Sequence, residues 1–409
     1  MRTIQPDELA SDRPYGEWSC RGRDIWDAFC AAEKGDAAGL PEVLERDPNL
    51  YRAEYWYTPP IHFAVRAGRI ETTQVLLEVG ADPAWKAMSG DDLATLARER
   101  GHDTLARLLE HESRRRQGVP KPKQPADDPI VAAARSGDFE QVRAHLAAEQ
   151  DPTPDATISR GLALHAAARA GNRPLVELLL DHGADPNFTI DSSGSATWAA
   201  STPELRQLLL DRGGRLDCYD LVFLDEDDEA VRRVKADPSE ADAGCGGVLA
   251  AACTLGKREL VVRLLVAGAR VAKVLTGCRG YLMSEPETLR LLLARADMDP
   301  NLPNWQRATP LHDLCSRDYR GRANPHRVEC AKILLDAGAR LTERDEDYRS
   351  TPLAWAARYD MPEMVELLLE RGSPIALSDD EDWATPMAWA TKRGHTAIAE
   401  RLKQAGATA

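Results

Sequence analysis

Residues 351–373 read TPLAWAARYDMPEMVELLLERGS, and the phrases at the two ends of this stretch recur along the chain. The leading phrase returns as PPIHFAVRAG (59–68), LALHAAARAG (162–171), TPLHDLC (309–315) and TPMAWATKRG (385–394). The trailing phrase returns as LLLDHGA (178–184), LLVAGA (264–269) and ILLDAGA (333–339), and in altered form as LLEVGA (76–81) and LLLDRGG (208–214). Gly338, Gly372 and Gly406 are 34 residues apart. Such a period is typical of proteins built from stacked repeats, so the chain is predicted to be a row of similar units.

Each unit is predicted to be a turn, a short helix, a tight reversal and a second helix. The threonine of the leading phrase can cap the first helix, and the proline after it loses no hydrogen bond at the first helical position. The glycine after the leucines supplies the left-handed backbone conformation that ends the second helix. Each unit then buries its leucines only against its neighbours, which predicts an elongated all-α stack.

This pattern resembles the ankyrin repeat family, whose unit of about 33 residues carries T-P-L-H, A-A-x-x-G and L-L-x-x-G-A at matching offsets. The resemblance implies an ankyrin-repeat solenoid of about twelve units, several of them degenerate. The units begin near residues 25, 54, 87, 129, 160, 191, 218, 244, 275, 304, 346 and 380. It also implies that the turn before each first helix, called the tip here, forms a concave surface together with the first helices, while the second helices face outward.

Several units depart from the pattern. The sixth and ninth units have room only for a stunted first helix before Ser-x-Pro-Glu (201–204 and 284–287). The seventh replaces the glycine between its helices with an acidic run, DEDDE (225–229), and the tenth inserts YRGRANPH (319–326) between its helices. Insertions of this kind map to loops in repeat proteins.

The stretch SRRRQGVPKPKQPADDP (113–129) has neither the repeat phrases nor apolar periodicity, which indicates a linker. We therefore predict a lead segment (1–24), a first array of about three units (25–112), a basic proline-containing linker (113–128) and a second array of about nine units (129–409). The sequence leaves open whether the two arrays form one continuous stack.

Composition excludes several classes of protein. The 409 residues carry a formal charge of −14, which disfavours a nucleic-acid partner. No stretch approaches the roughly 18 apolar residues of a membrane helix, and the first residues lack the apolar core of a signal peptide. The eight cysteines form no C-x-x-C pair and are predicted to be reduced core residues. We expect a cytoplasmic monomer that does not bind membranes.

No motif for catalysis, a metal or a cofactor is present in the sequence: G-x-x-x-x-G-K-[ST], H-E-x-x-H and G-x-S-x-G are all missing. His62, His165 and His312 stand at the H of the leading phrase, where the resemblance implies a hydrogen bond to turn backbone. The acidic run 225–229 lacks the alternating spacing of a calcium loop. A solvated helix start is therefore favoured there, and a site for a cation or a basic partner is the alternative.

Aromatic residues gather at the predicted tips, and aromatic side chains bury much area at little entropic cost. We predict that they anchor a protein partner on the concave face, together with residues at the ends of the last first helices. Packing of the aromatics on adjacent tips is the alternative. The predicted partner-contacting residues are Tyr55, Trp56, Tyr57, Trp305, Tyr348, Arg358, Tyr359, Trp383, Lys392 and Arg393.

The insertion in unit ten offers a second candidate surface. Its flanks and its own residues form a positive island for an acidic partner or an anionic ligand: Arg317, Arg320, Arg322 and Arg327. A tolerated loop is the alternative.

The function predicted from the sequence is a scaffold for protein–protein interactions without enzymatic activity and without a cofactor. One alternative is an enzyme, or a small-ligand or cation-binding protein, with its site between the arrays or at the acidic run. A pocket between the arrays that holds convergent carboxylates and a histidine would favour the enzyme. Another alternative is a bacterial effector or immunity protein that uses the stack as bait. The partner's identity is not encoded in any motif.

Overall fold

The computed structural model describes residues 3–15, 20–87, 89–117, 125–148, 154–190, 194–244, 246–271, 277–317 and 323–407. Helices dominate these ranges. The strands within them form two short antiparallel hairpins, β1 (Pro14–Tyr15) with β2 (Cys20–Arg21) and β3 (Thr189–Ile190) with β4 (Gly194–Ser195). The chain is an all-α repeat solenoid, as predicted.

The helices follow one another in pairs, one pair for each predicted unit. The lead segment contains α1 (Asp7–Ala10). Units one to three are α2 (Gly22–Lys34) and α3 (Leu40–Leu44), α4 (Pro60–Arg66) and α5 (Ile70–Glu78), and α6 (Leu93–Glu99) and α7 (Asp103–Arg115). After η1 (Pro125–Asp127), units four to six are α8 (Pro129–Ser136) and α9 (Phe139–Ala148), α10 (Pro154–Arg169) and α11 (Arg173–Asp181), and α12 (Ala196–Ala199) and α13 (Pro203–Asp211).

The pairing continues through the rest of the second array. Units seven to nine are α14 (Cys218–Phe223) and α15 (Asp227–Ala236), η2 (Pro238–Asp242) with α16 (Gly247–Thr254) and α17 (Arg258–Ala267), and η3 (Gly277–Met283) and α18 (Pro286–Arg295). Units ten to twelve are α19 (Pro310–Leu314) and α20 (Arg327–Asp336), α21 (Pro352–Arg358) and α22 (Pro362–Glu370), and η4 (Asp382–Ala384) with α23 (Pro386–Arg393) and α24 (Thr396–Gln404).

The local signals in the sequence have the predicted effects. The Thr351 and Thr385 side chains accept hydrogen bonds from the backbone N–H of the third helical residue, and a proline follows each threonine. Gly338 and Gly372 end their units with φ of 92° and 81°, the left-handed region that a side chain disfavours. The degenerate units are also as predicted, since α12 has four residues and η3 is a 3-10 helix.

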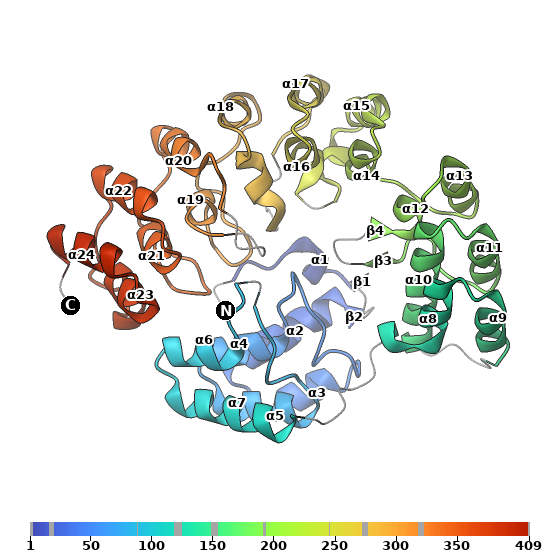
Figure 1. Cartoon of the computed structure of the whole chain (residues 1–409), viewed down its shortest axis with the longest axis horizontal. Coiled ribbons are helices and arrows are strands. Elements are labelled where there is room, and N and C mark those ends of the chain that lie inside the picture. The colour runs from blue at the N-terminus through green and yellow to red at the C-terminus, as the bar shows by residue number, and fades with distance from the viewer. Residues whose placement is uncertain are drawn as a thin grey trace.

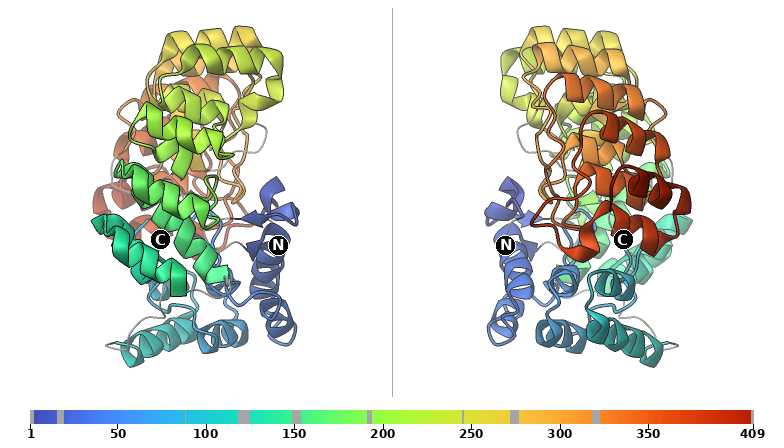
Figure 2. Two further views of the ribbon diagram at one scale, coloured as in Figure 1. Left: turned by 90° about the vertical axis from the view of Figure 1, so that its right-hand side faces the viewer. Right: turned by 90° about the vertical axis from the view of Figure 1, so that its left-hand side faces the viewer.

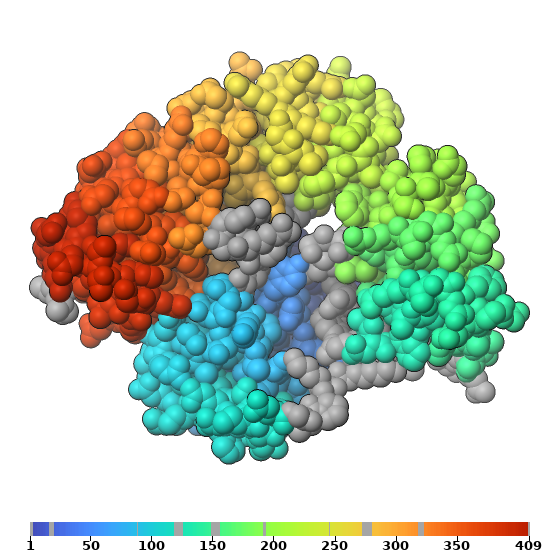
Figure 3. Space-filling model, in the orientation of Figure 1, coloured from blue at the N-terminus to red at the C-terminus, as the bar shows by residue number. Residues whose placement is uncertain are grey.

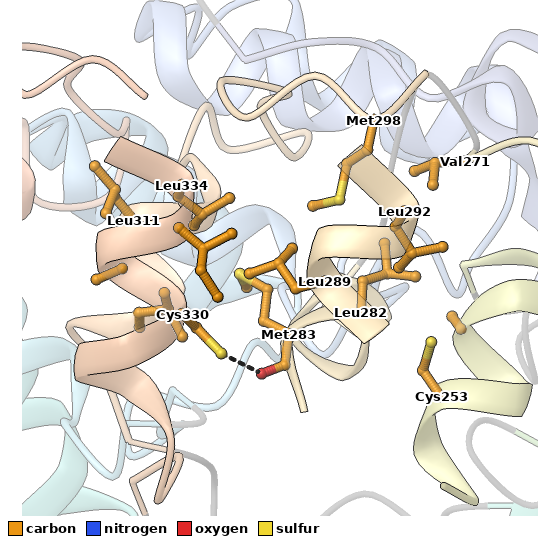
Figure 4. Packing of buried hydrophobic residues seen from close by; sticks show 14 of the residues in the cluster. Cys253, Val271, Leu282, Met283, Leu289, Leu292, Met298, Leu311, Cys330 and Leu334 are labelled. Carbon is orange, nitrogen blue, oxygen red and sulfur yellow. Dashed lines mark hydrogen bonds between the residues drawn. The ribbon is translucent and has the colours of Figure 1, made fainter. Parts of the chain in front are cut away.

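Buried leucines, alanines and other apolar side chains pack the units against one another. One cluster runs through units seven to twelve, a second through units four to six, and a third through the first array. Figure 4 shows the packing between units nine and ten, where Leu289 and Leu334 face one another and the Cys330 Sγ donates to the backbone oxygen of Met283 at 3.3 Å. Cys218, Cys253, Cys315 and Cys330 are buried thiols, in line with their predicted place in the core.

The two arrays do not form one continuous stack. The second array curves into an arc with its second helices outside and its first helices inside, and the first array lies across the mouth of that arc (Figure 1). Seen from the side, the helices of the first array extend beyond the arc at one end (Figure 2). In the described ranges, no helix is both long and apolar enough to cross a membrane.

Candidate functional site: the inter-array interface

The first array contacts units ten to twelve through a reciprocal exchange of tips. The tips of units ten and eleven (304–308 and 345–350) reach α2 and α4, while the tip of unit three (85–92) reaches α21 and α23. We call this contact the inter-array interface. Because each array inserts its tips into the other, the concave faces of both are covered where they meet.

Trp305, in the tip of unit ten, is the apolar centre of the interface. Its side chain belongs to the core of the first array and is 4% exposed. Its ring lies edge-on to Tyr55, with centroids 5.0 Å apart, and 6.0 Å from Phe63. The backbone N–H of Ile4 donates to its carbonyl oxygen at 2.8 Å. A tryptophan from one array thus completes the core of the other.

Arg66, at the end of α4, makes the main polar contacts with this tip region. The side chain is 3% exposed. Its Nη1 donates to Gln306 Oε1 at 2.7 Å and to Asp347 Oδ1 at 3.0 Å. Its Nη2 donates to Glu33 Oε1 at 2.9 Å and to Thr3 Oγ1 at 3.1 Å. A buried guanidinium with two carboxylates and two neutral acceptors has its donors well satisfied.

His62 also faces Asp347, with Nε2 3.2 Å from Oδ1. Burial lowers the pKa of His62, and the charges of Arg66 and Arg100 lower it further against the opposing effect of Asp347. Burial alone would raise the pKa of Asp347, but the hydrogen bond from His62 and the neighbouring positive charges hold it well below its usual range. The group is therefore a neutral imidazole beside an ionised carboxylate. This differs from the predicted role of His62 as a partner of turn backbone, which His312 fulfils by lying 3.0 Å from the Ser350 carbonyl.

A second buried ionic cluster lies around Arg358, at the end of α21. Arg358 is 3% exposed, and its Nη1 donates to both Glu99 carboxylate oxygens at 3.2 and 3.1 Å while its Nη2 donates to Asp91. Arg393 shares the same two acids at 2.9 and 2.6 Å. The Arg358 guanidinium also lies over the Tyr348 ring, 4.1 Å from its centroid. Burial lowers the pKa of Arg358, but Tyr348 and the two acids raise it more, so the pairing keeps it charged.

A cavity of about 430 Å³ lies at the edge of the interface, between the ends of α2, α4 and α6 and the tips of units eleven and twelve. Its lining residues are Glu33, Lys34, Arg66, Ala67, Arg69, Arg100, His102, Glu346, Arg349, Glu381 and Trp383. The pocket holds carboxylates and a histidine, as the enzyme alternative requires. However, Glu33 pairs with Arg66 at 2.9 Å, and Glu346 and Glu381 lie 3.6 and 3.7 Å from Arg349. Each of these carboxylates thus lies beside an arginine.

The ten predicted partner-contacting residues lie mostly in this interface. Tyr55, Trp305, Tyr348 and Arg358 are buried in it, and Lys392 donates to the Glu99 carbonyl at 2.5 Å. The Arg100 guanidinium stacks over Trp383, and Arg393 binds the acids of unit three. Trp56 packs against the core of the first array, Tyr57 is half-buried and the Tyr359 ring lies 5.7 Å from Trp355. In this structure, these residues contact the chain itself, and their contact with a separate partner stays a prediction.

The predicted positive island in unit ten is only partly described. Arg320 and Arg322 lie outside the described residues. Arg317 Nε donates to the Tyr359 carbonyl at 3.4 Å, and Arg327 pairs with Glu363. The two described arginines are therefore already engaged within the second array.

The acidic run of unit seven is neutralised by unit eight. Lys257 Nζ bonds Asp225 at 2.7 Å and Asp227 at 2.8 Å, and Arg263 pairs with Asp228. Residues 227–229 form the first turn of α15, which is the favoured interpretation from the sequence. Among the described residues, no group of three or more His, Cys, Asp or Glu side chains is placed to hold a metal ion.

No sequence pattern singled out the residues that the first array contributes to the interface: Arg66, Asp91, Glu99, Arg100 and His102. The signal that existed was the pair of acidic tips, GDD (90–92) in unit three and DED (345–347) in unit eleven. Neither tip identifies its partner, because a repeat pattern does not reveal which distant units meet.

Comparison with protein-family models agrees with the repeat geometry. A model described as "Ankyrin repeats (3 copies)" matches residues 280–379 and 322–409, and one described as "Ankyrin repeat" matches residues 162–191. The matches fall on units five and nine to twelve. The chain belongs to the ankyrin repeat family.

Proposed function

We propose that the protein is a non-enzymatic scaffold that binds a protein partner on the concave face of the second array, at units seven to nine. Repeats of this family are generally protein–protein interaction modules, which supports the general part of the proposal. The concave face of units ten to twelve is occupied by the first array. The choice of units seven to nine rests on the exposed apolar side chains that remain on the inner side of the arc.

Leu255 and Tyr281 carry this choice. Of the large apolar residues exposed in the described ranges, Val79, Phe139 and Val266 come from second-helix elements, whereas Leu255 and Tyr281 come from first-helix elements of adjacent units. Leu255 is 42% exposed at the end of α16, and Tyr281 is 43% exposed in η3. Exposed apolar side chains that gather on one face mark interaction surfaces more often than isolated ones do.

The neighbouring side chains suit a partner with apolar groups. Tyr219 and Phe223 of α14 are half-buried, with ring centroids 5.0 Å apart. Burial raises the pKa of Tyr219 to about 12, with the nearby Tyr281 adding to the effect. Burial also raises the pKa of Asp220 to about 7, and the adjacent Asp217 contributes. Figure 3 shows the molecule hollowed beside the yellow-green units, which gives access to this face from solvent.

The experiment that tests this function is quantitative affinity capture with the full chain and two surface variants. The double variant Leu255→Ser/Tyr281→Ala removes the exposed apolar groups of the inner face and is expected to lose the partner. Val266→Ser is the matched control, because Val266 is 81% exposed on α17, an outer helix. A partner retained by the double variant, or lost equally by the control, contradicts the proposed face.

The expectations of a monomer and of a cytoplasmic location belong to the same proposal. Excess negative charge favours soluble, non-associating chains, and the formal charge is −14. Light scattering after size-exclusion chromatography tests the first expectation, and imaging of a tagged chain tests the second.

A further inference from the structure

The cavity at the edge of the inter-array interface has an excess of positive charge. Its three carboxylates are each matched by Arg66 or Arg349, and Arg66 is matched a second time by Asp347. Lys34, Arg69 and Arg100 also line the cavity, and they form no ion pair with any other described residue. This positive excess stands out on a chain whose formal charge is −14.

Arg100 is the buried member of this group. The residue is 9% exposed, so most of its guanidinium is shielded from water. Its Nη1 donates to the Arg66 carbonyl at 2.8 Å and its Nη2 to the Glu346 carbonyl at 3.2 Å, while its buried Nε has no hydrogen-bond partner. A buried charge is costly unless it is paired, and an unfilled donor adds to that cost.

The electrostatic environment of Arg100 agrees with this geometry. Burial and the charge of Arg66 lower the pKa of Arg100 to about 10, although the carboxylates of Asp347 and Asp345 oppose the shift. The Trp383 ring lies 4.9 Å from the guanidinium carbon and shields one of its faces. An anion that enters the cavity would supply the missing counter-charge.

The shape and charge of the site narrow the class of anion. Arginine presents a planar fork of donors that matches the oxygens of phosphate. Five cations and three carboxylates line the cavity, and this net positive charge favours a multivalent anion over a single carboxylate. A volume of about 430 Å³ is in the range of small-molecule sites and too small for a folded partner. We propose that this cavity binds a small anion with two phosphate groups, such as pyrophosphate or a sugar bisphosphate.

A ligand at this place would touch both arrays. Lys34, Arg69 and Arg100 come from the first array, whereas Arg349 and Trp383 come from the tips of units eleven and twelve. The complete site exists only while the arrays are docked, so binding stabilises the docked form. The anion would act as a bridge between the arrays, independently of any partner at units seven to nine.

Calorimetric titration of the full chain with inorganic pyrophosphate tests the proposal, with fructose 1,6-bisphosphate as the organic probe and citrate as a polycarboxylate of similar charge. We expect saturable binding of at least one phosphate probe, tighter than that of citrate, and a higher Tm in its presence. No saturable binding of either phosphate probe at millimolar concentration overturns the proposal, and equal affinity for citrate overturns the assignment to phosphate.

Variants place the binding in the cavity. Arg100→Met removes the buried cation, and Lys34→Gln/Arg69→Gln removes two exposed cations without disturbing the core. Each is expected to weaken the Kd about tenfold or more, as for loss of a charge-assisted hydrogen bond. Arg169→Gln is the matched control, because Arg169 is an exposed arginine of unit five. Wild-type affinity in the Lys34→Gln/Arg69→Gln variant, which keeps the fold even if Arg100→Met does not, contradicts the proposal.

Discussion

Two regions of this molecule use the same repeat position in opposite ways. Arg66, Arg135, Arg169 and Arg358 each stand two residues before the reversal between the helices of their unit. Arg66 and Arg358, at the inter-array interface, are buried and bind acids of the opposite array. Arg135 and Arg169, in units four and five, are exposed. The repeat sets where the side chain projects, and the segment that faces it decides whether it becomes a buried ion pair.

The largest expected effect at the interface comes from its apolar centre. Trp305→Ala empties the space among Phe29, Tyr55 and Phe63, and loss of a buried tryptophan typically costs about 3–5 kcal/mol. We expect a drop of that size in the free energy of unfolding, measured by urea denaturation, and a larger radius of gyration in small-angle X-ray scattering. Trp198→Ala in unit six, where the tryptophan is half-buried, is the control. Equal losses of unfolding free energy in the two variants would mean that Trp305 contributes no more to stability than a half-buried tryptophan of unit six.

Substituting Arg358 and Arg169, which occupy the same repeat position, tests whether burial of the arginine at this position stabilises the fold. Arg358→Ala leaves Asp91 and Glu99 with Arg393 alone, and breaking buried charge-assisted hydrogen bonds costs about 2–3 kcal/mol when another partner remains. Arg169→Ala removes an exposed side chain at the same repeat position, and surface changes stay within about 0.5 kcal/mol. Thermal and urea unfolding of both variants measures the difference. Similar values would show that burial at this position contributes nothing to stability.

The smallest expected effect is a pH dependence at His62. Because the folded pKa of His62 is lowered from 6.5 by burial and by nearby arginines, the unfolded chain binds more protons below pH 6.5. Stability from this group is therefore complete above about pH 6.5 and is lost as the pH falls below it. Between pH 7.5 and 5.5, wild type should lose about 1 kcal/mol more than His62→Gln.

The matched variant separates His62 from other titrating groups nearby. Burial raises the pKa of Asp345 to about 6, so its contribution changes in the opposite direction, being lost as the pH rises through that value. Asp345 is present in both proteins and cancels in the difference between them. Parallel pH profiles for wild type and His62→Gln would show that His62 is not desolvated in the folded state.

The sequence carried nearly all information about the individual units. Thr351 and Thr385 at helix starts, Gly338 and Gly372 at helix ends and the shortened unit six all depend on interactions between residues close in the chain, and these were predicted. The sequence also pointed to Trp305 and Arg358 as residues made for contact. It did not indicate that Trp305 enters the core around Phe63, nor that Arg358 contacts Asp91. Those pairs are more than 200 residues apart, and a repeat pattern contains no information about how two arrays are placed relative to one another.

The lining of the cavity could not be predicted from the sequence, because it depends on how the two arrays are placed relative to one another. Arg69 and Arg100 follow the first helices of units two and three, whereas Arg349 and Trp383 stand in tips near the other end of the chain. Each residue is unremarkable within its own unit. A site between the arrays was considered only as an alternative, without residues, because its lining depends on how the arc closes.

The reciprocal exchange of tips has a consequence for competition. The first array is covalently joined to unit four, and through units four to nine to the face of units ten to twelve that it covers. It therefore acts as an intramolecular ligand for that face, and such ligands have effective concentrations on the order of millimolar. A free protein that binds units ten to twelve must therefore compete with the first array, which stays attached to the chain even when it undocks. A competing protein partner therefore needs either a very high affinity for that face or a separate process that first undocks the two arrays.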